Sequence, residues 1–222
     1  MAFFTKKFLD FFEELDKNNH KEWFDANRDW YEKDVKNPFK EFVTHLNAYV
    51  LKDNPTFNTN VSKNIFRINK DIRFSKDKTP YKTNVAAVFS KNGTKDVLPG
   101  FYIHFGLNEL LIGGGMYQVE KENLAKIRQE IFYNNSAFEK VFQQKDFKKY
   151  YGEIHGEKNK VLPSEYKEFV QTQPYIANKQ FYTMASVSKK ELLAHDFDKI
   201  VLAHFKALQP LNDFLNIAIA ED

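Results

Sequence analysis

The spacing of apolar residues changes twice along this chain of 222 residues, and that change constrains the fold more than any other feature. Before residue 53, apolar side chains recur three or four positions apart, which is the period of one helix face. Between residues 64 and 117 they tend to alternate, as in strands with one buried face. Helical spacing returns after residue 118. Helices before and after a group of strands predict an α+β fold.

The first region predicts three helices rich in aromatic residues. Thr5 is the expected N-cap of the first. Asn19 is the expected N-cap of the second, with Glu22 as its capping-box partner. A break at Asn37 should precede the third, which starts with Pro38. The predicted buried positions are Phe8, Phe11, Phe12, Leu15, Trp23, Phe24, Trp30, Tyr31, Phe39, Phe42, Val43, Leu46 and Val50.

The middle of the chain predicts a small central sheet, mostly antiparallel. The candidate strands are residues 65–75, 84–90, 100–105 and 109–114. A glycine-containing turn at residues 106–108 marks a hairpin between the last two. In the first strand, Phe66, Ile68, Ile72 and Phe74 should share the apolar face.

The last region, 118–222, predicts mainly helices and one further strand at 180–188. We expect residues 145–162 to be irregular, Ser188 and Glu191 to form a capping box, and Pro210 to kink or break the final helix. No linker or repeat divides the sequence, so we expect one compact domain over residues 1–222. It would comprise the helical segment 1–53, the sheet segment 64–117 and the segment 118–222.

The composition excludes several classes of protein. The formal net charge is only +3, so no overall attraction to nucleic acid or to an anionic membrane is expected. No apolar run reaches the roughly 18 residues that a membrane span needs. The absence of cysteine excludes disulfides and thiolate sites. The sequence therefore predicts a cytoplasmic protein that does not contact a membrane and for which nucleic acid is an unlikely partner. No metal or cofactor is implied.

The positive charge is concentrated in residues 66–83, which read FRINKDIRFSKDKTPYKT. This segment holds six Lys or Arg and two Asp, so its formal charge of +4 exceeds that of the whole chain. On the predicted strand, Arg67, Asp71 and Arg73 share one face. Asp71 between two arginines would fix both guanidinium groups for a carboxylate or phosphate. The following turn would add Lys76, Lys78, Tyr81 and Lys82 to this ligand site.

The alternative is that these charges form a salt-bridge network that only holds the structure together. Two further features carry the same kind of ambiguity. Gly113, Gly114 and Gly115, with Tyr117 close behind, predict either a backbone nest for an anion or a close approach in the sheet. His104 shares strand parity with Tyr102 and is the candidate acid or base, or else a histidine bonded within the sheet.

Several of these segments resemble one family. They are Trp23–Phe24, Trp30–Tyr31, the run 66–83, the strand FYIHF, the triple glycine with Tyr117, and Ile127–Arg128. Together they are similar to the domain of unknown function family 2461, conserved hypothetical proteins of bacteria and fungi. The resemblance covers most of the chain and implies a compact domain. It brings no activity, substrate or catalytic residue with it.

Two hypotheses follow for the function. In the first, the chain has a preorganised basic site for a small anionic ligand, a phosphate or carboxylate compound. In the second, it is a non-enzymatic interaction protein whose basic strand and turn dock on an acidic partner surface. The sequence contains no complete catalytic motif, so it leaves open whether the protein is an enzyme, and it predicts no oligomeric state.

Overall fold

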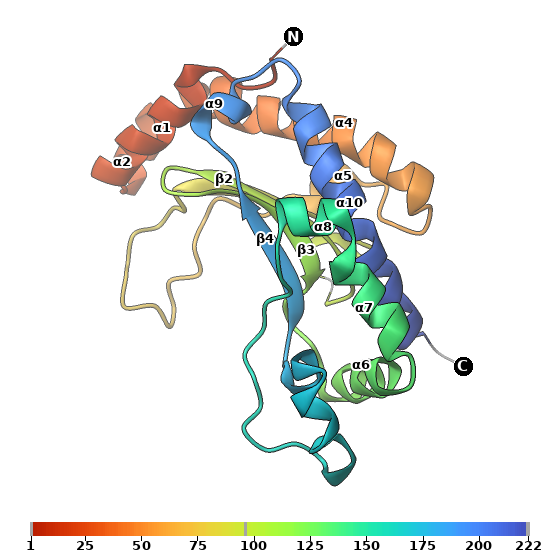
Figure 1. Ribbon diagram of the computed structural model, residues 1–222. Helices are drawn as coiled ribbons and strands as arrows, with labels where there is room; N and C mark the ends of the chain where they lie inside the picture. Colours follow the sequence, from red (N-terminus) through yellow and green to blue (C-terminus); the bar gives the residue numbers. More distant parts are fainter. Residues whose placement is uncertain (1, 96, 221–222) are drawn as a thin grey trace. The chain divides into compact units, whose positions relative to one another are not determined.

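The protein is described here by a computed structural model of residues 2–95 and 97–220 (Figure 1). It contains one four-stranded antiparallel sheet with helices before and after it, which confirms the predicted α+β class. The strands are β1 (Asn84–Phe89), β2 (Gly100–Gly106), β3 (Leu110–Met116) and β4 (Phe181–Ser186), and they lie in the order β1-β2-β3-β4. The predicted hairpin is formed by β2 and β3, where the amide of Gly106 donates to the carbonyl of Glu109.

The helices fall into two groups along the chain. Before the sheet come α1 (Lys6–Lys17), α2 (Lys21–Ala26), α3 (Arg28–Tyr31), α4 (Asn37–Asp53) and α5 (Val61–Asn64), with a π-helical segment at Glu32–Lys36. After β3 come α6 (Lys121–Tyr133), α7 (Asn135–Gln143), α8 (Lys145–Tyr150), α9 (Lys189–Leu192) and α10 (Phe197–Ala218). Short 3-10 turns lie at Gly93–Lys95, Ser164–Tyr166, Phe169–Gln171 and Pro174–Ala177.

The contacts group the described residues into two compact units. The first comprises residues up to Lys95 together with Tyr102–Ile112 and Ser186–Leu202. The second comprises residues 97–101, 113–185 and 203–220. Strands β2, β3 and β4 and helix α10 contribute residues to both. That the whole chain forms one domain stays a prediction.

The core of the first unit is built from phenyl rings. The ring of Phe42 stacks on Phe197 at a centroid distance of 5.4 Å, and Phe4 meets Phe42 at 5.1 Å and Phe105 at 5.8 Å. The apolar faces predicted for α1 and α4 are buried, which confirms both predictions. Their buried residues are Phe8, Phe11, Phe12, Leu15, Phe39, Phe42, Val43, Leu46 and Val50. Trp23 and Trp30 are only half-buried. Rings packed edge to face give this core its specific geometry.

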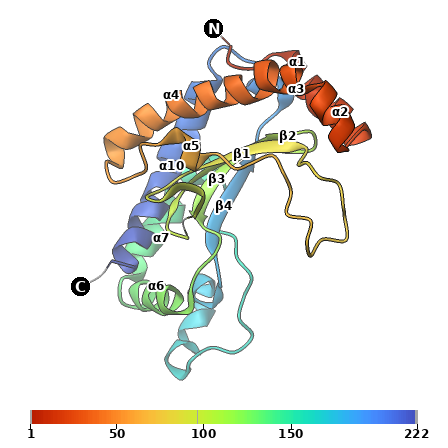
Figure 2. The same cartoon turned by 180° about the vertical axis from the view of Figure 1, so that it is seen from behind.

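Strand β2 has two different faces within this unit. Ile103 and Phe105 are fully buried, and Phe105 packs against Phe39 of α4. Tyr102 and His104 alternate with them and are half-buried. In both views α1 and α4 lie on one side of β1 and β2, while the loop that follows α5 extends from the other side (Figures 1 and 2). Tyr102 and His104 therefore belong to the face that the helices leave uncovered.

The second unit has its own aromatic core. Phe101 stacks on Phe205 at 4.5 Å, and Phe138 meets Phe214 at 5.0 Å. Arg128 is buried in this unit, and its guanidinium donates to the backbone carbonyls of Ile176 at 2.9 Å and Asn178 at 3.2 Å. A buried arginine whose donors meet carbonyls orders the irregular chain around it.

Two predictions about helix ends were wrong, and a third was wrong in part. The N-cap of α2 is His20, whose ring accepts from the amide of Trp23, because the side chain of Asn19 is bonded elsewhere. No break occurs at Asn37, because the π-helical segment carries the chain from α3 into α4 and Pro38 sits in the first turn. Helix α10 continues through Pro210, so the break predicted there does not occur, since packing of its apolar face outweighs one lost backbone bond; a kink at Pro210 stays a prediction.

Two predictions for the last region have opposite outcomes. Residues 145–162 are not irregular throughout, because α8 begins at Lys145. The capping box of Ser188 and Glu191 is present at the start of α9, with the serine accepting from the Glu191 amide at 3.1 Å.

The predicted strand at 65–75 does not form. The segment makes only two isolated bridges, Ile65 with Ala87 and Asn69 with Tyr81. Phe74, placed by its pattern on the apolar face, is 94% exposed. Asp71 and Asp77 bond to local backbone amides instead, and such side-chain bonds compete with a strand ladder.

The triple glycine lies inside β3. A Cβ atom on Gly113 would stand 2.1 Å from the carbonyl oxygen of Thr183, and one on Gly115 would stand 2.2 Å from that of Phe181. Gly115 also has a φ of +94°, which L side chains rarely adopt. Close approach of the β4 backbone at Gly113 and Gly115, and of the β2 carbonyl of Gly100 at Gly114, therefore accounts for these glycines, as in the second of the two interpretations.

A pair of substitutions tests this close approach. Gly152 has a φ of +79°, but a Cβ atom added there would meet nothing within 4 Å, so Gly152→Ala should cost only the backbone strain of about 1–2 kcal/mol. Gly115→Ala should cost about 3 kcal/mol or more, since it adds a collision with β4. Urea unfolding of both variants measures the difference. Equal losses would show that strand approach does not select glycine at position 115.

Candidate functional site

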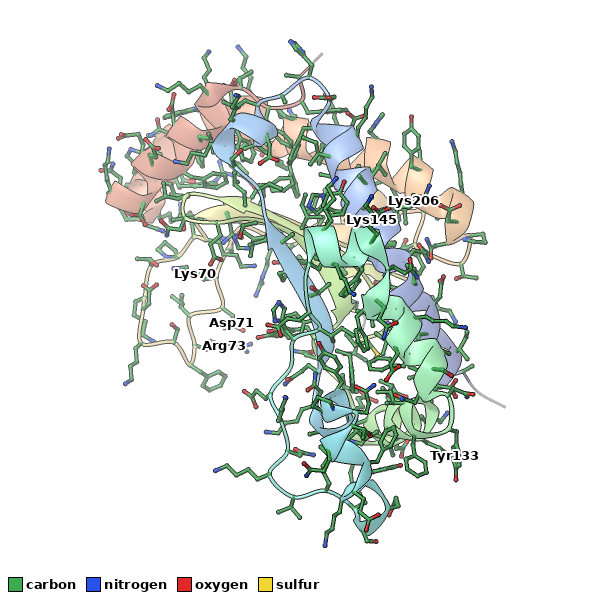
Figure 3. The ribbon with its side chains drawn as sticks, viewed as in Figure 1. Lys70, Asp71, Arg73, Tyr133, Lys145 and Lys206 are labelled. Carbon is green, nitrogen blue, oxygen red and sulfur yellow. The ribbon has the colours of Figure 1, made fainter. Side chains whose placement is uncertain are left out.

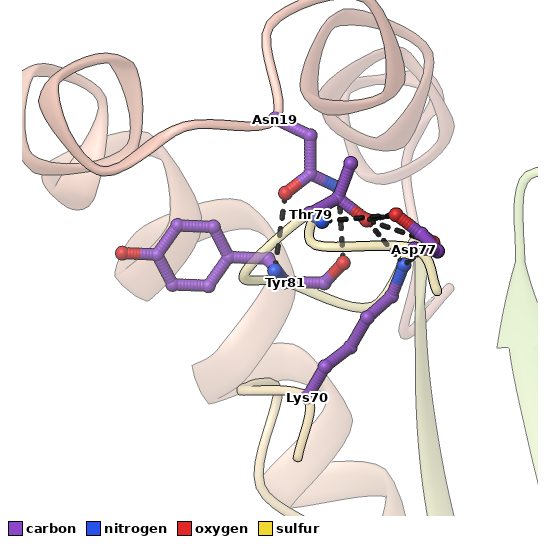
Figure 4. A network of polar contacts seen from close by, with 5 residues as sticks. All are labelled: Asn19, Lys70, Asp77, Thr79 and Tyr81. Atoms are coloured by element: carbon purple, nitrogen blue, oxygen red, sulfur yellow. Dashed lines mark hydrogen bonds and ion pairs between the residues drawn. The ribbon is translucent and has the colours of Figure 1, made fainter. Parts of the chain in front are cut away.

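Residues 66–83, here called the basic loop, are anchored to the helices through Tyr81. Its ring is buried and stacks on Phe24 of α2 at a centroid distance of 4.1 Å. Its amide donates to Oδ1 of Asn19 at 3.0 Å, and Nδ2 of Asn19 donates back to its carbonyl at 2.9 Å (Figure 4). Tyr81 is thus an anchor of the loop. Its ring is covered by the phenyl group of Phe24, whereas a ligand-binding role would require the ring to be accessible.

The part of the loop beyond this anchor is braced by Asp77. Its carboxylate accepts from the amide of Thr79 at 2.9 Å and from Nζ of Lys70 at 2.7 Å (Figure 4). The bond from Lys70, together with those from Thr79, holds the pKa of Asp77 well below its usual range. Lys70 is consequently neutralised within the loop.

Arg73 is likewise paired with a single carboxylate, that of Asp71. Its Nε donates to Oδ1 of Asp71 at 2.9 Å and its Nη2 to Oδ2 at 2.6 Å. The Arg73 side chain is 75% exposed and that of Asp71 43% exposed, on the loop that extends away from α1 and α4 (Figure 3). Among the residues that the structure describes, Asp71 forms no hydrogen bond with Arg67. The prediction that Asp71 orients two arginines was therefore wrong, because no strand brings the three onto one face.

Lys76 and Lys78 are exposed as well. The ammonium group of Lys78 donates to the carbonyl of Ile72 at 2.9 Å, which closes the turn. The tip of the loop is therefore a solvated, internally bonded turn. It does not converge with the remaining cations.

Those remaining cations lie at the base of the loop. Nζ of Lys82 donates to the backbone carbonyl of Arg67 at 3.0 Å and lies 5.6 Å from the centroid of the Phe66 ring. Phe66 in turn meets Tyr102 of β2 at 6.3 Å, edge to face. Tyr102 Oη and His104 Nδ1 are 3.2 Å apart. We call Arg67, Lys82, Tyr102 and His104 the basal cluster.

Burial controls the electrostatics of this cluster. It lowers the pKa of Lys82, and the positive charge of Arg67 lowers it further. It raises the pKa of Tyr102 to about 12, so the phenol stays protonated at neutral pH. Burial also lowers the pKa of His104, with the carboxylate of Glu109 opposing this and the charge of Lys82 adding to it.

The structure thus divides the residues predicted for the ligand site. Contacts join Lys82 to the backbone carbonyl of Arg67 and to the Phe66 ring, and join Phe66 through Tyr102 to His104. The structure places Asp71, Arg73, Lys76 and Lys78 on the turn beyond. Gly113, Gly114, Gly115 and Tyr117 belong to the second unit. Tyr102 and Phe66 were missed as site residues. Tyr102 could have been found because it shares a strand face with His104. Phe66 was missed because the strand wrongly predicted at residues 65–75 placed it on the face opposite Arg67.

The basal cluster contains several hydrogen-bond donors. A guanidinium group, a partly desolvated ammonium and a phenol can all donate to a carboxylate or phosphate. Across residues 2–95 and 97–220 no three His, Asp or Glu side chains gather as a metal site would require. No described helix is long and apolar enough to cross a membrane.

Comparison with known proteins gives one match. The sequence pattern of a family described as conserved hypothetical protein (DUF2461) matches residues 7–214. No curated protein and no solved structure matches this chain. The match covers the α1 stripe, the basic loop and most of α10 alike.

Titration of His104 tests the electrostatics of the cluster. Because burial lowers its pKa, the midpoint observed by NMR should lie below about 6.5. Glu109→Gln should lower the midpoint further, and Lys82→Met should raise it. A midpoint at or above the ordinary value would show that the ring is solvated.

The same shift makes stability depend on pH. The unfolded chain binds the His104 proton more tightly than the folded one, so stability from this group is fully present above the ordinary pKa. It should fall as the pH drops from about 6.5 through the lower folded value. His104→Gln should flatten that part of the stability profile, measured by urea unfolding between about pH 8 and pH 5.

Proposed function

The chain belongs to the DUF2461 family of conserved hypothetical proteins, and we propose that it binds a small anion, a phosphate or carboxylate compound, at the basal cluster. Arg67 and Lys82 supply the charge, and Tyr102 and His104 supply further polar contacts. The cysteine-free sequence favours a reducing compartment, so the proposal includes a cytoplasmic location.

One observation carries this proposal: two neighbouring cations of the described chain lack a carboxylate partner. Lys70 and Arg73 each form an ion pair with an aspartate of the loop. In residues 2–95 and 97–220, neither Arg67 nor Lys82 forms one. Burial lowers the pKa of Lys82 and the positive charge of Arg67 lowers it further, so the folded chain holds the two cations near each other at an electrostatic cost.

An anion between the two would remove that cost. Arg67 is exposed and presents a planar fork of donors that suits carboxylate and phosphate oxygens. Lys82 is half-buried, so its charge is less screened by water and interacts more strongly with an anion than a surface lysine does. The anchor at Tyr81 fixes the adjacent Lys82 before the ligand arrives, which reduces the entropy lost on binding.

The second hypothesis, docking on an acidic partner surface, is favoured by a different feature. Phe74 is 94% exposed at the tip of the basic loop, with the Arg73 guanidinium 5.8 Å from its ring. Aromatic and arginine side chains are frequent anchors in protein interfaces. In this function the tip would make the contact, while the basal cluster would be only structural. Phe74→Ala would then abolish binding to acidic peptides without altering any response to phosphate.

Three matched substitutions test the anion site. Phosphate at about 100 times its Kd should stabilise the wild type by about 2.7 kcal/mol. Arg67→Met and Lys82→Met should lose this stabilisation, because each removes a charge that faces the ligand. Arg73→Met is the control and should keep it, since Arg73 is paired with Asp71 at the loop tip.

Thermal melts across a phosphate titration, with sodium chloride at matched ionic strength, provide the measurement. Sulfate should act like phosphate. If all three variants respond like the wild type, or if chloride stabilises equally, the basal cluster is not an anion site.

A further inference from the structure

Tyr117 and Tyr182 form a pair of aromatic rings that the proposed anion site does not use. Tyr117 follows β3 and is 65% exposed. Its ring meets that of Tyr182 on β4 at a centroid distance of 5.0 Å and an interplanar angle of 72°. Within the described residues neither phenol forms a hydrogen bond. Hydrogen bonding of the two hydroxyl groups therefore does not account for the placement of these rings.

The glycines of β3 bring the two rings together. A Cβ atom on Gly115 would stand 2.9 Å from Cα of Tyr182, so a side chain there would keep β4 away. Tyr117 lies two residues further along the chain. On its other side Tyr182 is held by His155, whose amide donates to the Tyr182 carbonyl at 2.7 Å and whose ring centroid lies 5.6 Å from that of Tyr182. Gly115 and Tyr117 thus belong to one structural feature.

The faces of these two rings are open to a cation from outside the chain. The face of an aromatic ring is electron-rich and attracts positive charge. At the exposed ring of Tyr49 the protein itself supplies that charge, because Nζ of Lys52 lies 4.6 Å from the ring centroid. In residues 2–95 and 97–220, no lysine or arginine lies over Tyr117 or Tyr182 in this way.

The charged groups beside this pair suit a cationic ligand. The carboxylate of exposed Glu153 lies 3.9 Å from Nδ1 of His155, with Oε1 as the nearer oxygen. Lys179, three residues before Tyr182, is paired with Glu157 at 3.1 Å. A carboxylate close to the rings attracts a cation, and the neighbouring lysine is neutralised.

We propose that Tyr117 and Tyr182 bind the trimethylammonium group of a small quaternary ammonium compound, with choline as the simplest example. Ring faces that stand at a large angle to each other contact two sides of a bulky cation at once. A primary ammonium would lose hydrogen bonds to water on such a surface, whereas a quaternary ammonium has no N–H group and loses none. This site lies in the second unit and does not depend on the anion site.

Titration of the full chain with choline chloride, followed through the NMR resonances of the tyrosine rings, tests the proposal. Sodium chloride at matched ionic strength is the salt control. Neohexanol, an alcohol in which a carbon atom replaces the nitrogen of choline, measures apolar contact alone. Choline should shift the ring resonances of Tyr117 and Tyr182 and should bind several-fold more tightly than neohexanol. Equal binding of the two compounds, or no shift with choline, would overturn the proposal.

Variants assign the binding to this pair of rings. Tyr117→Leu removes an exposed ring and should weaken choline binding about two- to five-fold, the change that one exposed cation–π contact produces. Tyr117→Phe should keep most of the binding, since the ring face remains. Tyr133→Leu is the matched control and should bind like the wild type, because Tyr133 is similarly exposed but meets the ring of Phe132 alone. Unchanged binding in Tyr117→Leu, or an equal loss in both leucine variants, would overturn the assignment.

Phosphatidylcholine presents the same trimethylammonium group at a membrane surface, so vesicles distinguish the two sources. In sedimentation with phosphatidylcholine vesicles the chain should stay in the supernatant, because a pair of rings offers little apolar area for insertion. Binding to the vesicles without a response to free choline would overturn the assignment to a small compound.

Discussion

The attachment of Tyr81 to the N-terminal helices is the constraint on which the candidate site depends. The stacked ring of Phe24 and the two hydrogen bonds of Asn19 fix both the side chain and the backbone of one loop residue. The next residue is Lys82, so its amine is held beside Phe66 and Arg67 even though the loop has no regular strand. Residues far apart in the chain thereby give a loop the rigidity that a site needs.

The same loop shows why the number of charges is a poor guide to a binding site. Exposed ion pairs such as Asp71 with Arg73 contribute little to stability because water and salt screen them. They do, however, neutralise their cations. What remains at the base is the exposed Arg67 and the half-buried Lys82, and for Lys82 a lower effective dielectric makes each charge interaction stronger. Fewer cations of the segment are therefore left unpaired than its composition indicates.

The fold supports this arrangement by giving β2 two different faces. Ile103 and Phe105 are held in a core of phenyl rings, and this commits Tyr102 and His104 to the opposite face. The site consequently rests on a strand whose register is fixed by burial, since a shift of one residue would exchange the two faces. On this face, Phe66 of the basic loop contacts Tyr102.

Much of the fold was predictable from the sequence because it depends on local periodicity. The stripe from Phe8 to Leu15 and the hairpin of β2 and β3 each follow from the spacing of apolar residues and from turn chemistry. The segment 65–75 was not, because its alternation is that of a strand while Asp71 and Asp77 bond to nearby amides and end the ladder.

The sequence alone determined the α+β class and the concentration of positive charge in residues 66–83, since both are properties of residue order. Only the tertiary structure decided which of those charges remain unpaired. In the folded chain Asp71 pairs with Arg73, and Asp77 pairs with Lys70. Arg67 and Lys82 lie near enough for the charge of one to lower the pKa of the other, and among the described residues neither forms an ion pair. Pairing depends on distances in the folded chain, which the spacing of residues along the sequence does not fix.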